Sequence, residues 1–279
     1  MNCDFLGFFM EIELDYSKIL EENATHYFEE AKKYRKKIAG LKIALQVAEN
    51  KLKTSENRKE NEKNTTIKKV LPQRTKKWFM NYRWFFTSEN LLVIGGNDAK
   101  SNEEIVKKRM KKNDIYFHAE VFGAPHCIIV APEKLRGKEF IAGENSMTEA
   151  ATFAVTFSKA WEEKRTIADA YSVKPEQVSK SAKPGEHLST GSFMIYGERN
   201  WFKKTPLNCA IGFFPKEKTL MCGPINAIKK NCSFFVEIKQ GDKSKELTAK
   251  KLKETFEKKR FAFSIDNFVS LLPNGKFEI

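Results

Sequence analysis

Aromatic and cationic side chains alternate in one short run of this chain, KKWFMNYRWF. Large flat side chains beside fixed positive charges can stack on nucleic-acid bases and contact the phosphates between them. A half-buried strand with one solvated face has the same composition, and the pattern alone favours that structural role by roughly two to one. If the run binds nucleic acid, Lys77 and Arg83 are the preferred phosphate contacts and Trp78 the preferred stacking residue, with Lys76 beside them and Trp84 buried.

A glycine-rich turn follows, between the apolar run LLVIGG and an expected helix. Backbone N–H groups in such a turn can bind a phosphate. No Gly-Lys-Ser/Thr follows and no GxGxxG is present, so this is not a nucleotide-binding loop of either common type. The alternative is that Gly95 and Gly96 only permit a tight turn. Candidate RNA contacts in this stretch are Asn97, Asp98, Lys100, Asn102, Lys107 and Lys108.

Two histidines and a carboxylate form the most enzyme-like group. On a strand, His118 and Glu120 point to one face, and His126 could return beside them on the next strand. Such a group could bind a metal or transfer a proton. However, no HExxH and no nucleophile turn is present, and structural or RNA-facing histidines are favoured about nine to one. We therefore predict no catalytic residue, metal or cofactor, and retain His118 and His126 as RNA contacts.

A basic loop punctuated by proline and glycine, around Lys180, Lys183 and Pro184, is a further candidate because binding residues are common on loops. An ordinary solvated loop is an equally good interpretation from the residues alone.

The charge balance favours an anionic polymer as partner. There are 50 Lys and Arg against 36 Asp and Glu, a formal net charge of +14. A basic membrane surface is the rival partner, but no amphipathic helix has a clean apolar face opposite lysines, and no lipidation motif is present. No apolar run reaches the ~20 residues that span a bilayer.

Cysteine usage predicts a reducing compartment. The five cysteines are odd in number, show no CxxC pairing and partly lie in apolar runs, so buried free thiols are expected. They are Cys3, Cys127, Cys209, Cys222 and Cys232. The opening NCDFLGFFM is too short and lacks the flanks of a signal peptide, which predicts a cytosolic protein.

Near the N-terminus, apolar residues recur at alternating spacings of four and three, which is the heptad pattern of a coiled coil. We call these positions the heptad seam. They are Leu20, Ala24, Tyr27, Ala31, Tyr34, Ile38, Leu41, Leu45, Ala48 and Leu52. No second heptad arm is visible, so this exposed apolar stripe requires a partner helix, either from another copy or from a separate chain.

The remaining pattern predicts an α+β fold, a compact mixed sheet with helices, preceded by the long helix. Expected strands lie at 82–87, 91–95, 115–121, 127–130, within GSFMIYG, and at 207–214 and 234–238. Expected helices lie at 101–111, opened by a Ser101–Glu104 capping box, from Ser146 through Trp161, and at 245–258 and 265–272.

Four sequence blocks occur in an order and spacing similar to those of a known family. They are WFMNYRWF, VIGGNDAKSNEEIVKK, DIYFHAEVFGAPH and KPEQVSKSAKPGEHLSTGSFMIYG. Together they resemble the NFACT-R (RNA-binding) domain of the NEMF / fibronectin-binding-protein-A-like family. One departure is Tyr196, which stands where many relatives have Arg. An RNA contact by that Arg would be lost here or replaced by stacking.

The resemblance implies an RNA-binding factor of ribosome-associated quality control. The family binds tRNA and the obstructed large ribosomal subunit and extends stalled chains with alanine or alanine/threonine, while the ribosome supplies the peptidyl transfer. The family's NFACT-N domain and partner arm are not found in this sequence, so it resembles a second half, whether a fragment, a split gene product or a reduced homologue. Tail synthesis by this chain alone is therefore not expected.

The resemblance also suggests a domain division. We expect an apolar segment at 1–16, a coiled-coil arm at 17–56, a basic linker at 57–73, an NFACT-R-like domain at 74–200 and an α+β extension at 201–279. Two other functions remain open. One is a coiled-coil interaction module without specific RNA binding, and the other, weaker one is a small metal-dependent hydrolase that uses His118, Glu120 and His126.

Overall fold

The computed structural model describes residues 13–63, 76–135, 140–180 and 189–279. They belong to two compact units, which divide between the long helix and the remainder of the chain. Each unit is described by itself. The predictions for residues 1–12, for most of the basic linker, for Cys3 and for Lys183 lie outside the described residues.

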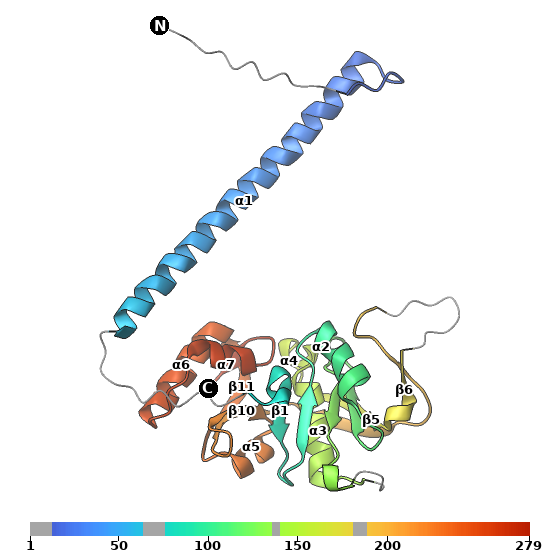
Figure 1. Cartoon of the computed structure of the whole chain (residues 1–279), viewed down its shortest axis with the longest axis vertical. Helices are drawn as coiled ribbons and strands as arrows, with labels where there is room; N and C mark the ends of the chain where they lie inside the picture. The colour runs from blue at the N-terminus through green and yellow to red at the C-terminus, as the bar shows by residue number, and fades with distance from the viewer. Residues whose placement is uncertain (1–12, 64–75, 136–139, 181–188) are drawn as a thin grey trace. The chain divides into compact units, whose positions relative to one another are not determined.

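The first unit is the helix α1 (Leu20–Lys63), which runs unbroken through the heptad seam as predicted (Figure 1). It continues to Lys63, so residues 57–63, which were expected to belong to the linker, are helical. Glu21 and Glu22 lie in its first turn, where negative charge favours the helix dipole. Leu20, Leu41 and Leu45 of the heptad seam are each more than 60% exposed. Among the described side chains, this apolar stripe is therefore uncovered within its own unit.

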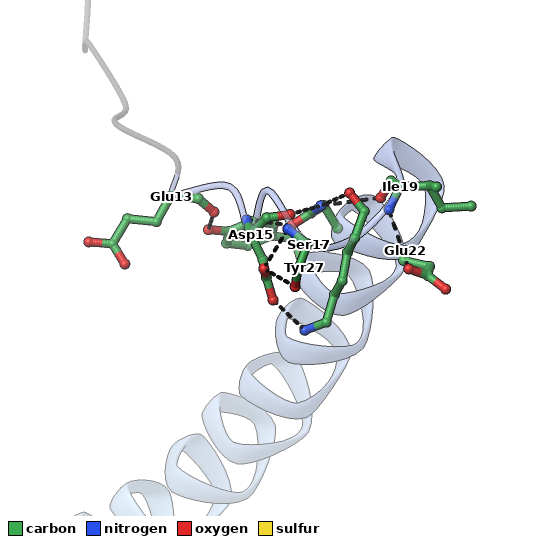
Figure 2. A network of polar contacts seen from close by, with 8 residues as sticks. Glu13, Asp15, Ser17, Ile19, Glu22 and Tyr27 are labelled. Carbon is green, nitrogen blue, oxygen red and sulfur yellow. Dashed lines mark hydrogen bonds and ion pairs between the residues drawn. The ribbon is translucent and has the colours of Figure 1, made fainter.

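The residues before α1 fold back onto its first turns (Figure 2). The Asp15 carboxylate accepts hydrogen bonds from the backbone N–H and the hydroxyl of Ser17, and it pairs with Lys18 at 2.9 Å. The Tyr27 hydroxyl donates to the carbonyl of Glu13. Asn23, which is only 8% exposed, donates to the carbonyl of Asp15. These bonds hold residues 13–18 against the first two turns of α1.

The second unit is built on a six-stranded antiparallel sheet in the order β1-β2-β4-β3-β5-β8. Its strands are β1 (Arg83–Phe86), β2 (Leu92–Gly95), β3 (Ile115–Ala119), β4 (Cys127–Ile129), β5 (Ile167–Val173) and β8 (Asn200–Pro206). A two-stranded ribbon joins β6 (Val178–Ser179) to β7 (Met194–Ile195). The strands expected in the first half of this unit are confirmed, whereas β5 and β8 were not predicted.

Short helices flank this sheet. They are η1 (Trp78–Asn81), α2 (Ala99–Glu104), the π-helix η2 (Ile105–Arg109), η3 (Glu133–Leu135), α3 (Glu144–Thr156), α4 (Lys159–Glu162) and η4 (Pro175–Gln177). The alanines of α3 and its single phenylalanine, Phe153, are fully buried, and α3 contacts β3, β4 and β5.

Two expected helix boundaries are corrected. Ser146 does not begin α3: the helix starts at Glu144, and the Ser146 hydroxyl donates to Thr87 at 2.9 Å. The helix also ends at Thr156 rather than continuing to Trp161, because Ser158 breaks the run and caps the separate helix α4.

A second, four-stranded antiparallel sheet has the order β10-β9-β11-β12. Its elements are β9 (Cys209–Phe214), β10 (Thr219–Gly223), α5 (Ile225–Asn231), β11 (Phe234–Lys243), α6 (Lys245–Lys258), α7 (Ile265–Leu271) and β12 (Phe277–Glu278). Helices α6 and α7 lie side by side in Figure 1 and contact each other. Cys127, Cys209 and Cys222 are buried free thiols in this unit.

The two sheets do not separate at the expected boundary between residues 200 and 201. Strand β8 begins at that boundary and pairs with β5 in the first sheet. Phe214 of the second sheet stacks on Phe86 at 5.4 Å between ring centroids and meets Trp84 at 6.0 Å. One shared aromatic core therefore joins both sheets.

Candidate nucleic-acid interface

Trp78 is an exposed aromatic residue beside the cation of Arg109. The turn η1 leaves 42% of its surface open to solvent. The Arg109 guanidinium lies 5.3 Å from the Trp78 ring centre, and its Nε donates to the Tyr82 hydroxyl at 3.0 Å. Tyr82 and Trp84 are buried, as expected for Trp84. Arg109 was missed from the sequence, although the run KKRMKK pointed to this segment.

Lys76 and Lys108 are chain neighbours of Trp78 and Arg109, and we call the set of Lys76, Trp78, Lys108 and Arg109 the tryptophan face. Lys76 and Lys108 are exposed, and none of the described residues forms an ion pair with them. Lys100 is exposed in the same way on α2. Lys77 and Lys107 are instead paired, with Glu217 at 2.5 Å and Glu103 at 2.6 Å. The Lys77 side chain is half exposed, but that of Glu217 is mostly buried, so a phosphate at Lys77 would compete with a fixed carboxylate.

Arg83 does not lie on the tryptophan face, and that expectation is corrected. Alternation along β1 turns Trp84 toward Phe214 and turns Arg83 the opposite way, where its guanidinium packs 4.6 Å from the ring centre of Phe157. Its Nη1 is buried without a hydrogen-bond partner. Burial lowers the pKa of Arg83. Arg83 therefore lies on the other side of β1 from Trp84, where it lines a cavity.

The glycine-rich turn is closed by its own side chains. Its capping residue is Asp98, whose carboxylate accepts from the backbone of Ser101 at 2.7 Å, so the capping box expected at Ser101–Glu104 is corrected. The backbone N–H groups of Asn97 and Asp98 both donate to the Ser101 hydroxyl. These donors are therefore already satisfied. The Asn102 amide oxygen is also engaged, since it accepts from the backbone of His126 at 3.0 Å.

His118 and His126 are brought together, as the strand pattern predicts, with ring centroids 4.6 Å apart. Nδ1 of His118 donates to the carbonyl of Pro125 at 3.1 Å, and His126 Nδ1 bonds to the Tyr116 hydroxyl. Burial, the largest cause, lowers the pKa of His118 to about 4 and that of His126 to about 3. Both imidazoles are therefore neutral near pH 7.

Glu120 does not join the two histidines. It is exposed, and its carboxylate lies 3.6 Å from the guanidinium of Arg199. Across the described ranges no group of three His, Cys, Asp or Glu side chains could hold a metal ion. Nor does any helix in those ranges have the length and apolar character needed to cross a membrane.

Acid should destabilise this unit through the two histidines. Their pKa values are lower in the folded chain than the usual 6.5, so the unfolded chain binds protons more readily. Stability is fully present above about pH 6.5 and falls as the pH drops toward 4. We expect a loss of about 3 kcal/mol for each histidine over that range. Urea titrations from pH 7.5 to 4 measure it, and His118→Gln should reduce the slope. An equal slope in that variant would contradict the assignment to His118.

Lys180 is held inside a loop. Its ammonium donates to the carbonyl of Ser189 at 2.8 Å and lies 5.0 Å from the ring centre of Phe193. The Glu103 carboxylate is 3.4 Å away and also accepts from the backbone of Gly191. Lys180 therefore fastens this loop to α2. Tyr196, at the departure from the family pattern, is 44% exposed.

Most of the predicted contacts among the described residues fall into two groups, and Lys77, Lys100, Lys107 and Lys180 belong to neither. Lys76, Trp78 and Lys108 belong to the tryptophan face. A cavity of about 590 Å³ brings the second group together at one end of the six-stranded sheet. Its lining includes the candidates Arg83, Asn97, Asp98, Asn102, His118 and His126.

Comparison with known proteins identifies the fold around both groups. Residues 81–197 match the family described as the NFACT protein RNA binding domain, NFACT-R. The chain belongs to the NFACT family. That region contains the cavity lining except Asn274, and it contains Lys108 and Arg109, whereas Lys76 and Trp78 precede it.

Relatives with known names support the same assignment. The archaeal Rqc2 homolog aRqcH of Methanocaldococcus jannaschii is 37% identical over 214 residues, which are 76% of this chain and 30% of that protein. The human ribosome quality control complex subunit NEMF is 39% identical over 202 residues, 70% of this chain and 17% of NEMF. This NFACT chain therefore spans less than a third of either relative.

Among solved structures, the C-terminal part of the fibronectin/fibrinogen-binding protein from Streptococcus suis is 17% identical, with a TM-score of 0.37. The aligned region covers 67% of this chain and 77% of that one.

Proposed function

We propose that this NFACT chain binds RNA in ribosome-associated quality control, with tRNA or the RNA of the large ribosomal subunit as its target. The observation that supports this most strongly is the family match to an RNA binding domain over residues 81–197. The relatives named above are ribosome quality control proteins. The tryptophan face supplies the matching chemistry, an open indole ring beside cations.

Co-sedimentation with purified large ribosomal subunits over a salt series tests this proposal. Binding through phosphates releases counterions, so the logarithm of the affinity should fall linearly with the logarithm of the salt concentration. Binding that is absent at low salt, or that does not weaken as salt is added, would contradict it.

Within that process the chain acts by positioning RNA, not by its own chemistry. Any assistance to alanine or threonine tailing would leave the peptidyl transfer to the ribosome. The nearest arrangement to a catalytic group, His118 with His126, lacks the expected carboxylate because Glu120 pairs with Arg199. Because the chain would act on ribosomes, we also propose a cytosolic location.

The heptad seam of α1 supports a second part of the proposal, a helical partner. Tyr34, Ile38, Leu41 and Leu45 are each more than half exposed along one stripe. Such a stripe is stabilised when a second helix packs against it as a coiled coil. The partner is another copy of the chain or a separately encoded helical arm.

Replacing Leu41 and Leu45 by Glu should abolish association through α1, because two charges would enter the packed stripe. The measurement is sedimentation velocity of the chain over a range of concentrations. Ala39→Glu with Gln46→Glu is the matched control, since these exposed neighbours add the same charge beside the stripe. A soluble monomer at high concentration with α1 fully helical would refute the helical-partner proposal.

A further inference from the structure

The cavity among the loops of the six-stranded sheet has the size and walls of a ligand site. Its volume of about 590 Å³ lies within the range of small-molecule pockets. Three segments bound it, at 96–102, 121–126 and 189–193, and Arg83 and Phe157 also line it. We call it the loop cavity.

The loop cavity contains an uncompensated positive charge. Arg83 forms no ion pair with any described residue, its Nη1 has no hydrogen-bond partner, and its guanidinium packs against the Phe157 ring. A buried charge without a counter-charge is costly, and the aromatic ring offsets only part of that cost. Asp98 is the one acid among the described lining residues, and its carboxylate is occupied by Ser101. The charge balance therefore favours an anionic ligand.

The same cavity is also lined by uncharged aromatic rings. His118 stacks on His126, and Phe193 meets the edge of that pair at 5.2 Å. Because Nδ1 of His118 donates to the Pro125 carbonyl, Nε2 of the neutral ring is a hydrogen-bond acceptor. The described residues provide no donor to it. An aromatic ligand with an N–H group fits this arrangement.

The loops around the cavity are fixed before any ligand arrives. The Glu103 carboxylate bonds to the backbone of Gly191 at 3.0 Å, and the Gly96 backbone donates to the carbonyl of His126. Gly191 has φ +80°, and a side chain there would meet the backbone of Ala99. Ordered walls reduce the entropy lost on binding.

We propose that the loop cavity receives one unpaired nucleotide of the bound RNA, with its phosphate at Arg83 and its base against His118 and Phe193. This rests on the proposed RNA-binding function and specifies a single-stranded position within it. The tryptophan face then binds the backbone outside the cavity. A free nucleotide shares this chemistry, so the experiment must separate the two sources.

The first test is photo-crosslinking of the whole chain to an RNA hairpin with a single 4-thiouridine in its unpaired loop. Mass spectrometry should locate crosslinks in the cavity wall, at Phe122, Tyr171 or Phe193. Crosslinks confined to Trp78 and its neighbours would overturn the proposal, and they would leave the RNA-binding function intact.

The second test uses Arg83→Met, which keeps most of the side-chain volume and removes the charge. We expect it to bind the hairpin on the order of tenfold more weakly, while a fully paired duplex of equal length binds as before. Arg109→Met on the tryptophan face is the matched control and should weaken both RNAs. Hairpin binding by Arg83→Met within twofold of the wild type would overturn the proposal.

Two controls separate the remaining explanations. The melting temperature of Arg83→Met should equal or exceed that of the wild type, because an uncompensated buried charge is removed. Calorimetry with adenosine monophosphate alone should give much weaker binding than the hairpin. Equal affinities would identify a free-nucleotide site and overturn the RNA version. Failure of the wild-type chain to bind any RNA would refute the proposed function itself.

Discussion

Replacing Phe214 by Ala is expected to lower the free energy of unfolding of the second unit by about 3–5 kcal/mol. Phe214 is 1% exposed and lies outside the matched family region, in the sheet formed by β9 to β12. Its ring packs on Phe86 and Trp84 of the first sheet. The substitution would leave a cavity at the junction of the two sheets, so both sheets should lose stability together.

Urea titration followed by tryptophan fluorescence measures this loss. Phe122→Ala is the matched control, since this phenylalanine is 79% exposed and should cost less than about 1 kcal/mol. Two separate unfolding transitions, or a similarly small loss for Phe214→Ala, would show that the sheets are independent domains divided near residue 200.

The double substitution of Lys76 and Lys108 by Ala should weaken binding to tRNA or ribosomal RNA by roughly ten- to a hundredfold at low salt. Both lysines are exposed on the tryptophan face, and no described residue neutralises either of them. Loss of two phosphate contacts should also reduce the salt slope by about two units. Filter binding over a salt series measures both quantities.

The control for this experiment is Lys250→Ala with Lys258→Ala, two exposed lysines of α6 that give the same change in net charge. That variant should keep nearly the full slope if the contacts are local. Equal weakening in the two variants would indicate that only the overall charge of the chain matters, and it would remove the tryptophan face from the proposed interface.

These two experiments address different levels of the molecule. The Phe214 substitution tests how the sheets are held together, and the lysine substitutions test where the surface meets RNA. Because Lys76 and Lys108 are exposed, their replacement should leave the unfolding free energy within about 0.5 kcal/mol. Binding and stability can thus be changed separately in this NFACT chain.

Local sequence patterns determined much of the fold. The heptad spacing predicted one long helix, and α1 runs unbroken over it. The expected helix at 245–258 agrees with α6, whose first turn is capped by Ser244. Such elements depend on residues a few positions apart, so their signals are complete within a short window. The ordered motifs identified the family for the same reason.

Strand β5, whose neighbours in the sheet include a strand that is distant in the sequence, could not be predicted from a short window of residues. Strand β5 lies between β3 and β8, and its pattern of burial reflects those neighbours and α3. Its run IADAYSV alternates only weakly between apolar and polar residues. A strand covered on both sides gives little local periodicity, so only the assembled sheet reveals it.

The division of the candidate site was decided by tertiary structure alone. Arg83 and Trp78 are five positions apart and looked equivalent as nucleic-acid contacts. Pairing of β1 within the sheet turned Arg83 toward Phe157, which is more than 70 positions away, while η1 left Trp78 open beside Arg109. The residue types showed that this chain could contact RNA. Which of them face solvent and which line a cavity depended on burial by distant segments, and no short stretch of sequence contains that information.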